Sequence, residues 1–418
     1  MDITMGNMKA TSQSQKNSQM AQNCLRINYL LSVATGLLFT VLYSQDARAL
    51  TLNEAVNAQL ETISLPCDRL LGSDPATVLS GGLADICARA VPFGSTPQAA
   101  GGSAANLSTL SSSSMTAMQE GQVREETQIG SQWTLFFTAE GESLDRDVTE
   151  GEDGFDSTAL RLVAGAIYAP TTSTDIGFAF TRQRHDGDYV NGGNFEADTN
   201  GLRVLATSYL TDQLFLQAMA GYDWVSSQRA RAATFEEYFN GSLVFSREGE
   251  PYSDFEYNQT EVSLLAGYNY ARGNMTLTPQ LGVTWLNTDY GTYSEAGNSG
   301  LELTFHDDQR ESLQSSLGLQ AAMAISTGFG VAIPQLDVYW KHEFEDKSRR
   351  VNVSFTQDTR AQQFSYDTEA GDSNFAEVGA GLAFVFSQGN QAFIRVQTLL
   401  EHEFYDSVII SAGLNIAL

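Results

Sequence analysis

Long hydrophobic runs are missing from this chain of 418 residues: after the first 50 positions no 18 consecutive residues are apolar. A membrane-spanning helix needs about 20 such residues, so we do not expect the mature chain to cross a membrane with helices. Basic residues are also scarce, with 23 against 50 acidic residues and a formal net charge of −27. A polyanion of this size repels a phosphate backbone, which excludes nucleic acid as a partner.

The residue patterns of metal sites and common catalytic sites are missing too. Four histidines and three cysteines are present, without H-x-x-x-H or C-x-x-C spacing. Neither a G-x-S-x-G motif nor a Gly-rich phosphate loop occurs. His342 near Ser348 could mimic the Ser and His of barrel-embedded lipid hydrolases, but we interpret them as a strand-end histidine beside a loop serine. We therefore expect no enzyme, no cofactor and no metal.

The N-terminus has the organisation of an export signal. Lys9, Lys16 and Arg26 precede an apolar core at Leu30–Tyr43, and Ala47-Arg48-Ala49 fits the rule of small residues before a cleavage site. The sequence therefore predicts a signal peptide over residues 1–49, cleaved after Ala49.

Two segments follow that differ from the rest of the chain. Residues 50–92 show apolar residues at helical spacing, and Cys67 and Cys87 are the only cysteines left after removal of the signal. An even pair in an oxidising compartment predicts a disulfide, here closing a small helical hairpin. Residues 93–130 begin as a linker rich in Gly, Ser and Ala, and end in a segment, 107–130, that we expect to form a helix plugging a pore.

From Trp133 to Leu418 the chain alternates apolar and polar residues one by one, which is typical of strands with one apolar and one polar face. The alternation predicts twelve strands, at 131–140, 157–169, 175–185, 200–210, 213–228, 255–271, 274–290, 310–326, 329–344, 374–386, 390–402 and 405–418.

The gaps between these strands alternate in length. We expect tight turns at 170–174, 211–212, 272–273, 327–328 and 387–389, and long loops at 141–156, 186–199, 229–254, 291–309 and 345–373. A sixth gap in the second set, 403–404, is short. This asymmetry, with aromatic residues at strand ends, is typical of an outer-membrane barrel with tight periplasmic turns.

The predicted fold class is therefore all-β: a twelve-stranded antiparallel transmembrane β-barrel over residues 131–418. A lumen of that width holds water, so polar residues are expected inside it. The inward candidates are Arg161, Arg203, Glu261, Glu377, Arg395 and Glu401. Loop 141–156 holds seven acidic residues without the spacing of an EF-hand, so we interpret it as solvated rather than as a Ca²⁺ site.

Four segments follow one another near the C-terminus: PQLDVYWKHEF at 334–344, RRVNVSFTQDTRAQQFSYD from Arg349, GAGLAFVFSQGNQAFIRVQ, and the closing SAGLNIAL. In this order they resemble the C-terminal part of the translocator domain of the autotransporter family (type V secretion). The chain departs from the family pattern at Leu418, where an aromatic residue is usual, and it has no Asn-Asn pair in 107–130. Only residues 50–105 stand where the family carries a large passenger.

The resemblance implies a barrel in the outer membrane of a Gram-negative bacterium that presents or translocates this very short module. Its expected partners are outer-membrane lipid and lipopolysaccharide, and the barrel-assembly machinery during insertion. Two alternatives stay open: a passive cation-favouring pore, and a surface protein whose loops 229–254 and 345–373 bind an extracellular ligand. A barrel enzyme has the least support.

Overall fold

A computed structural model describes residues 133–418 except 150–151, 240–241, 329 and 387–388. The predicted signal peptide with its cleavage site at Ala49, the hairpin with Cys67 and Cys87, and the plug segment 107–130 all lie outside the described residues. Within the described ranges, no helix is long and apolar enough to cross a membrane.

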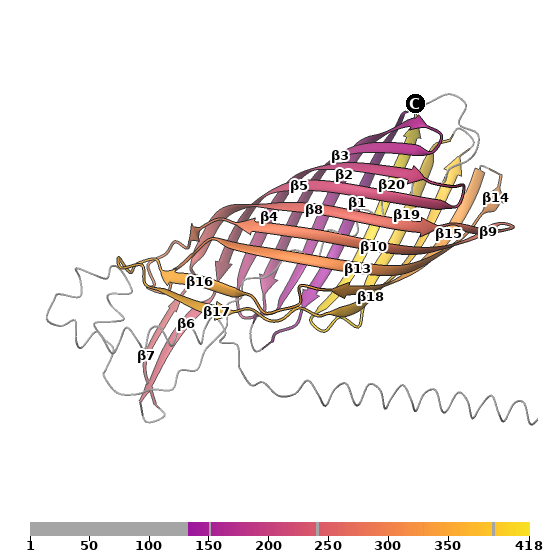
Figure 1. Ribbon diagram of the computed structural model, residues 1–418. Coiled ribbons are helices and arrows are strands. Elements are labelled where there is room, and N and C mark those ends of the chain that lie inside the picture. The colour runs from indigo at the N-terminus through magenta and orange to yellow at the C-terminus, as the bar shows by residue number, and fades with distance from the viewer. Residues whose placement is uncertain (1–132, 150–151, 240–241, 329, 387–388) are drawn as a thin grey trace, which may run out of the picture. The chain divides into compact units, whose positions relative to one another are not determined.

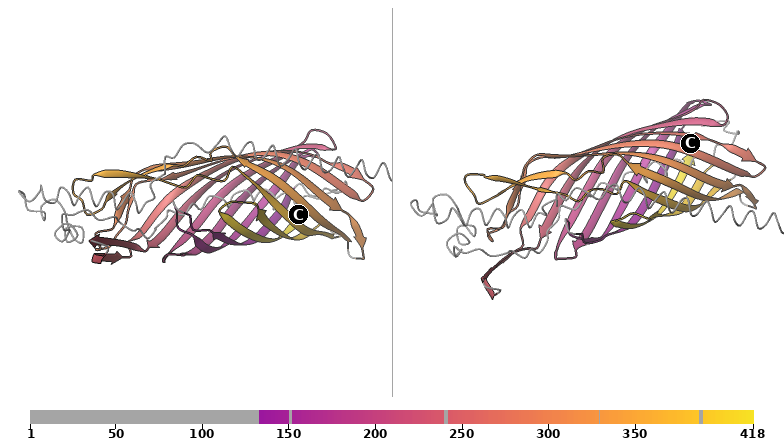
Figure 2. Two further views of the ribbon diagram at one scale, coloured as in Figure 1. Left: turned by 90° about the horizontal axis from the view of Figure 1, so that it is seen from below. Right: turned by 60° about the horizontal axis from the view of Figure 1, so that its bottom comes forward.

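Twelve antiparallel strands close into a barrel, as the alternation predicted (Figures 1 and 2). Consecutive barrel strands are neighbours, and the first strand pairs with the last along Thr134–Ala417 to Arg146–Tyr405. Short β9 (Tyr270–Arg272) and β14 (Ile325–Thr327) continue two of the strands. The barrel strands are β1 (Trp133–Arg146), β2 (Phe155–Thr171), β3 (Thr174–Tyr189), β4 (Gly193–Tyr209), β5 (Leu214–Arg231), β8 (Tyr252–Tyr268), β10 (Met275–Tyr290), β13 (Asp308–Met323), β15 (Gly330–Glu343), β18 (Asn374–Phe386), β19 (Gln391–Leu400) and β20 (Tyr405–Ala417).

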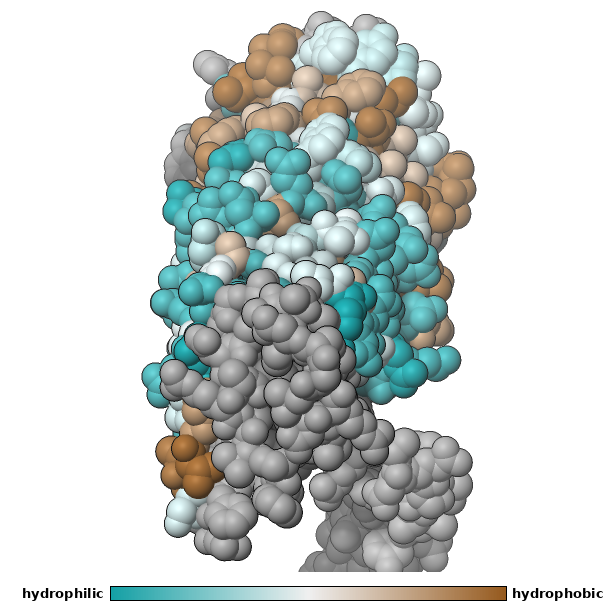
Figure 3. Space-filling model, turned by 90° about the vertical axis from the view of Figure 1, so that its left-hand side faces the viewer, coloured by the Kyte–Doolittle hydropathy of each residue, from teal (hydrophilic) through white to brown (hydrophobic). Residues whose placement is uncertain are grey.

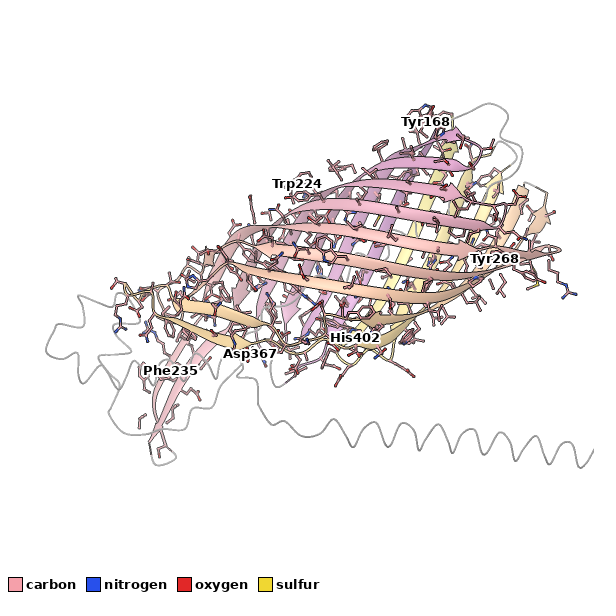
Figure 4. All side chains as sticks on the ribbon, in the orientation of Figure 1. Tyr168, Trp224, Phe235, Tyr268, Asp367 and His402 are labelled. Carbon is pink, nitrogen blue, oxygen red and sulfur yellow. The ribbon has the colours of Figure 1, made fainter. Side chains whose placement is uncertain are left out.

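Successive residues of each strand face opposite sides of the barrel wall. On β10, Leu281 is 59% exposed on the outside, whereas Gln280 is 3% exposed and faces the interior. Outward apolar residues form a band around the wall, and Tyr168, Tyr268 and Trp224 lie on its outer surface (Figure 4). An apolar band flanked by aromatic residues is the surface that a bilayer requires.

The two ends of the barrel differ in their connections. The end that holds Trp133 and Leu418, called here the turn end, has connections of two to four residues such as 172–173 and 210–213. The opposite end, called the loop end, holds the three longest connections, 232–251, 291–307 and 344–373. The expected asymmetry is confirmed.

Two predicted long loops are wrong in their bounds. The gap expected at 186–199 is a continuous hairpin in which β3 and β4 pair as far as Asp188 and Asn194. The gap expected at 141–156 shrinks to 147–154, because β1 runs to Arg146. Both hairpins stand beyond the apolar band, where outward residues such as Arg182 and Asp198 form ion pairs in water instead of facing lipid. The alternation of apolar and polar residues therefore stops before the strands do.

The long connections fold into a cap at the loop end (left in Figure 1). It consists of a hairpin, β6 (Ala233–Phe239) with β7 (Ser242–Gly249), and a sheet of β11 (Tyr293–Ser294), β12 (Leu303–Phe305), β16 (Arg350–Phe355) and β17 (Gln363–Asp367). Its core joins all three connections: Ala233, Leu301, Leu303, Phe305, Val351, Val353, Phe355 and Tyr366. The described surface seen from this end is mostly hydrophilic (Figure 3).

The interior is less uniformly polar than the sequence pattern suggested. Near the turn end, Phe136, Met219 and four other apolar residues form a buried cluster on the inner wall. Near the loop end, a second cluster holds Phe155, Phe195 and Phe255 with several other inward residues. Charged side chains occupy the level between them.

Candidate functional site: the charged lumen of the barrel

The first group of lumen charges lies on β1, β2 and β3. The Arg161 guanidinium donates from Nε to Gln183 Oε1 at 2.9 Å and from Nη1 to Glu140 Oε1 at 3.2 Å. Arg161 and Glu140 face each other directly in the strand register, and both are buried. Their pairing spans three adjacent strands and neutralises the guanidinium within the wall.

A second group lies on β4, β5 and β8. Arg203 binds Asp223 through two parallel hydrogen bonds of 2.7 Å each, and its Nη2 is 3.8 Å from Glu261 Oε2. Glu261 accepts a further hydrogen bond from the Ser263 hydroxyl at 3.3 Å. A bidentate pair of this kind is the strongest hydrogen-bond geometry between a guanidinium and a carboxylate.

A third group lies on β15, β18 and β19. The three groups together are called here the lumen ring. Arg395 Nη2 donates to Asp337 Oδ2 at 2.6 Å, and Lys341 forms an ion pair with Glu377. Gln397 donates to the other oxygen of Glu377 at 2.6 Å. Glu377 thus has partners on both neighbouring strands, whereas the Arg395–Asp337 pair reaches across β18 from β19 to β15.

Five of the six predicted lumen residues, Arg161, Arg203, Glu261, Glu377 and Arg395, are buried on the inner wall. The sixth position is a correction. Glu401 lies exposed in the turn between β19 and β20, with φ +58°, so it cannot line the lumen. The strand was expected to run to residue 402, but β19 ends at Leu400.

Among the inward charges that sequence reasoning missed are Glu140, Asp223, Asp337 and Lys341, which belong to these three groups. Each lies an even number of positions from an inward residue on its own strand, so the period of two would have found them. Glu142, bonded to Ser407 at 2.8 Å, joins the same level. The ring therefore holds more carboxylates than basic groups, and its charges pair within the wall.

Aromatic stacking links the inner wall to the cap. The Phe255 ring on β8 stacks on Tyr293 with centroids 4.0 Å apart, and Tyr293 stacks on Phe305 with centroids 4.8 Å apart. Phe255 belongs to the cluster inside the barrel, whereas Phe305 belongs to the core of the cap. The cap and the inner wall therefore share one apolar interface.

The acidic loop after β1 is more ordered than the solvated loop that we expected. Arg146 pairs with Glu152 at 2.6 Å and donates to the Asp153 carbonyl at 2.7 Å, and both acidic residues are buried. Thr149 donates to Glu369 at 3.0 Å, which ties this loop to the connection between β15 and β18. The loop is ordered by hydrogen bonds to a second loop that is distant in the sequence, and a local sequence pattern does not predict such bonds.

The histidine and serine considered for hydrolysis contact different residues and not each other. His342 Nδ1 is 3.0 Å from Asn374 Oδ1, and Ser348 donates to the Thr368 carbonyl at 2.5 Å. In the part of the chain that the structure describes, no three histidine, cysteine or acidic side chains have the arrangement of a metal site.

Residues 135–397, more than half of the chain, match the family described as the autotransporter beta-domain. The chain belongs to this family. No curated protein matches the sequence.

Solved autotransporter structures share the fold. The chain is similar to the translocator domain of the autotransporter NalP from Neisseria meningitidis, with a TM-score of 0.56, 12% identity, and coverage of 73% of this chain and 94% of that one. It is similar to the beta domain of the Bordetella autotransporter BrkA, with a TM-score of 0.50, 14% identity, and coverage of 69% and 100%. At these identities the likeness concerns the fold.

Proposed function

We propose that this autotransporter barrel carries its own short N-terminal module, residues 50–105, to the cell surface. The position of the first strand is the observation that carries the proposal. Trp133 lies at the turn end, where its carbonyl accepts a hydrogen bond from the Leu418 amide at 3.1 Å. Since tight turns face the periplasm in outer-membrane barrels, a surface module must be connected to Trp133 through the lumen.

Segment 107–130 has the length for that passage. As a helix its 24 residues extend about 36 Å, and the hydrocarbon core is about 30 Å thick. The lumen charges already pair with one another, so we propose that the plug is held by polar contacts with the wall and not mainly by salt bridges. Barrel-assembly machinery would insert the protein, with lipopolysaccharide around its outer half.

A protease experiment on intact cells tests this proposal. An epitope tag placed near Gly101 should be removed by external protease, while a matched tag after Leu418 should stay protected. Protection of both tags in cells with correctly inserted barrel would contradict surface presentation. It would favour the alternative of a passive pore, cation-favouring because carboxylates outnumber basic groups in the lumen ring.

The cap favours a second candidate function, binding of an extracellular ligand. Leu243 and Val244 on its hairpin are each 50% exposed, although they lie far from the membrane-facing band. Exposed apolar residues on a folded surface element are a common feature of binding sites. Removal of the connection 232–251 would abolish ligand capture by whole cells while leaving the tag near Gly101 accessible.

A further inference from the structure

Two arginines at the loop end form no ion pair with a carboxylate of the described residues, unlike the other arginines of the inner wall. Arg229 on β5 and Arg310 on β13 face inward and are partly buried. Arg229 Nε and Arg310 Nη1 are buried atoms without a hydrogen-bond partner among the described residues. Burial of a cation without a counter-charge is unfavourable, so this arrangement requires an explanation.

Neighbouring arginines at the same end show the contrast. Arg231 binds Glu295 through two bonds of 2.7 and 2.8 Å, Arg146 pairs with Glu152, and Arg349 pairs with Asp308. The chain has 50 acidic residues and a net charge of −27. A shortage of carboxylates therefore does not explain why two positions remain unpaired.

Aromatic side chains lie around Arg229. Tyr189, Tyr290, Tyr293 and Tyr366 are near it, and its guanidinium lies 5.6 Å from the centroid of Phe255. This cation–π contact compensates only part of the desolvation of a guanidinium. The Tyr366 hydroxyl is another buried group without a hydrogen-bond partner among the described residues.

Ring contacts connect Arg229 with Tyr366. Phe255, beside Arg229, stacks on Tyr293, Tyr293 stacks on Phe305, and Phe305 belongs to the same core cluster as Tyr366. Arg310 approaches this region from β13, where its charge acts on Glu152 and Glu152 acts on Tyr366. Two guanidinium groups and a hydroxyl thus provide hydrogen-bond donors in a region lined by aromatic rings. Carboxylate and phosphate groups are the acceptors that match such donors.

We propose that the mouth of the barrel beneath the cap binds a small oxyanion from the external medium through Arg229, Arg310 and Tyr366. Carboxylate and phosphate share the required chemistry, and the tyrosine rings favour a ligand that carries this group beside an apolar or ring portion. Binding at this site is independent of surface presentation of residues 50–105. Either proposal can therefore fail without the other.

Calorimetric titration of the full-length protein, refolded in detergent micelles, tests the site. Sodium phosphate and sodium acetate are titrated separately at constant ionic strength, with sodium chloride as the blank. We expect saturable binding of at least one oxyanion, and the two titrations tell which group is preferred. Arg229→Gln and Arg310→Gln should each weaken binding at least about tenfold, which corresponds to the loss of about 1.4 kcal/mol.

Two further variants make the result decisive. Arg272→Gln removes an exposed arginine near the turn end and should bind as the wild type does. If a glutamine variant fails to fold, as judged by heat-modifiable migration, Arg229→Lys keeps the charge but loses the fork of donors and should still weaken binding. Absence of saturable binding, or equal affinity in the wild type and both glutamine variants, would overturn the proposal. Binding that appears only after deletion of residues 50–92 would also overturn it. Carboxylates of that segment, and not an external oxyanion, would then be the groups that fill the site in the intact chain.

Discussion

The Tyr339 ring on β15 lies directly over Gly318 on β13, and its hydroxyl donates to Gln280 on β10 at 2.9 Å. A Cβ at position 318 would lie 2.2 Å from the ring, so only glycine leaves room for it. Similar pairs place Phe136 over Gly165, Phe215 over Gly267 and Phe393 over Gly413. Such pairs lock neighbouring strands in register on the inner wall.

Gly318→Ala should therefore destabilise the barrel. The ring must move and lose its bond to Gln280, a combination of overpacking and a lost hydrogen bond that costs about 1–3 kcal/mol. The midpoint of urea unfolding in micelles measures the effect. Gly141→Ala is the matched control, because no atom lies within 4 Å of a Cβ built there. Equal midpoints for the two variants would contradict the packing role of Tyr339.

Leu281→Arg should impair assembly more than Gln280→Arg. Leu281 faces the bilayer, where an arginine near the midplane costs about 2–4 kcal/mol. Gln280 faces the lumen, and its replacement mainly removes the bond from Tyr339. The yield of heat-modifiable protein per cell measures assembly. The assignment of inner and outer faces would be wrong if both variants assembled equally well.

Removal of one partner of the Arg203–Asp223 pair should be more harmful than removal of both. Arg203→Met leaves two acidic residues, Asp223 and Glu261, without their shared cation, and breaking a buried pair costs about 3–5 kcal/mol. The double variant Arg203→Met with Asp223→Leu leaves less uncompensated charge. Thermal unfolding followed by circular dichroism should rank the double variant above Arg203→Met. The reverse order would show that the pair adds little in a hydrated lumen.

The cap should lose stability in acid through Glu302. This buried carboxylate accepts hydrogen bonds from the Ser299 amide at 2.7 Å, the Ser299 hydroxyl at 2.8 Å and the Gly300 amide at 2.9 Å. Burial raises its pKa, but these bonds outweigh burial and hold the pKa below its ordinary value of 4.5.

Because the folded carboxyl binds a proton less readily than the unfolded one, its contribution is complete above pH 4.5 and is lost as the pH falls through the lower folded pKa. Hydrogen exchange in residues 291–307, corrected for intrinsic rates, should show protection falling in this range. Glu302→Gln should flatten the profile, whereas Glu248→Gln on the exposed side of the hairpin should not. A profile unchanged by Glu302→Gln would assign the acid sensitivity to another group.

Deletion of residues 107–130 should raise single-channel conductance in planar bilayers, if this segment plugs the lumen as proposed. The opened pore should prefer cations, because carboxylates outnumber basic groups in the lumen ring. Deletion of residues 50–92 alone serves as the control and should leave the conductance unchanged. The same conductance in the wild type and the 107–130 deletion would place that segment outside the barrel.

The period-two alternation predicted all twelve barrel strands, because a wall between lipid and an interior imposes opposite polarities on successive residues. The same rule placed Leu281 outside and Arg203 inside. It failed where that environment ends: β3 and β4 continue into water with charged outer faces, and Glu401 lies beyond the end of β19.

The sequence by itself determined the barrel, its strand number and which end holds the tight turns, since these follow from a local pattern that repeats along the chain. Only the tertiary structure decided which charges pair in the lumen and how the long connections fold. Arg395 meets Asp337, 58 positions earlier, and the cap core joins Ala233, Phe305 and Val353. Such contacts depend on strand register and barrel closure, which bring distant residues together and leave no periodic signal in the sequence.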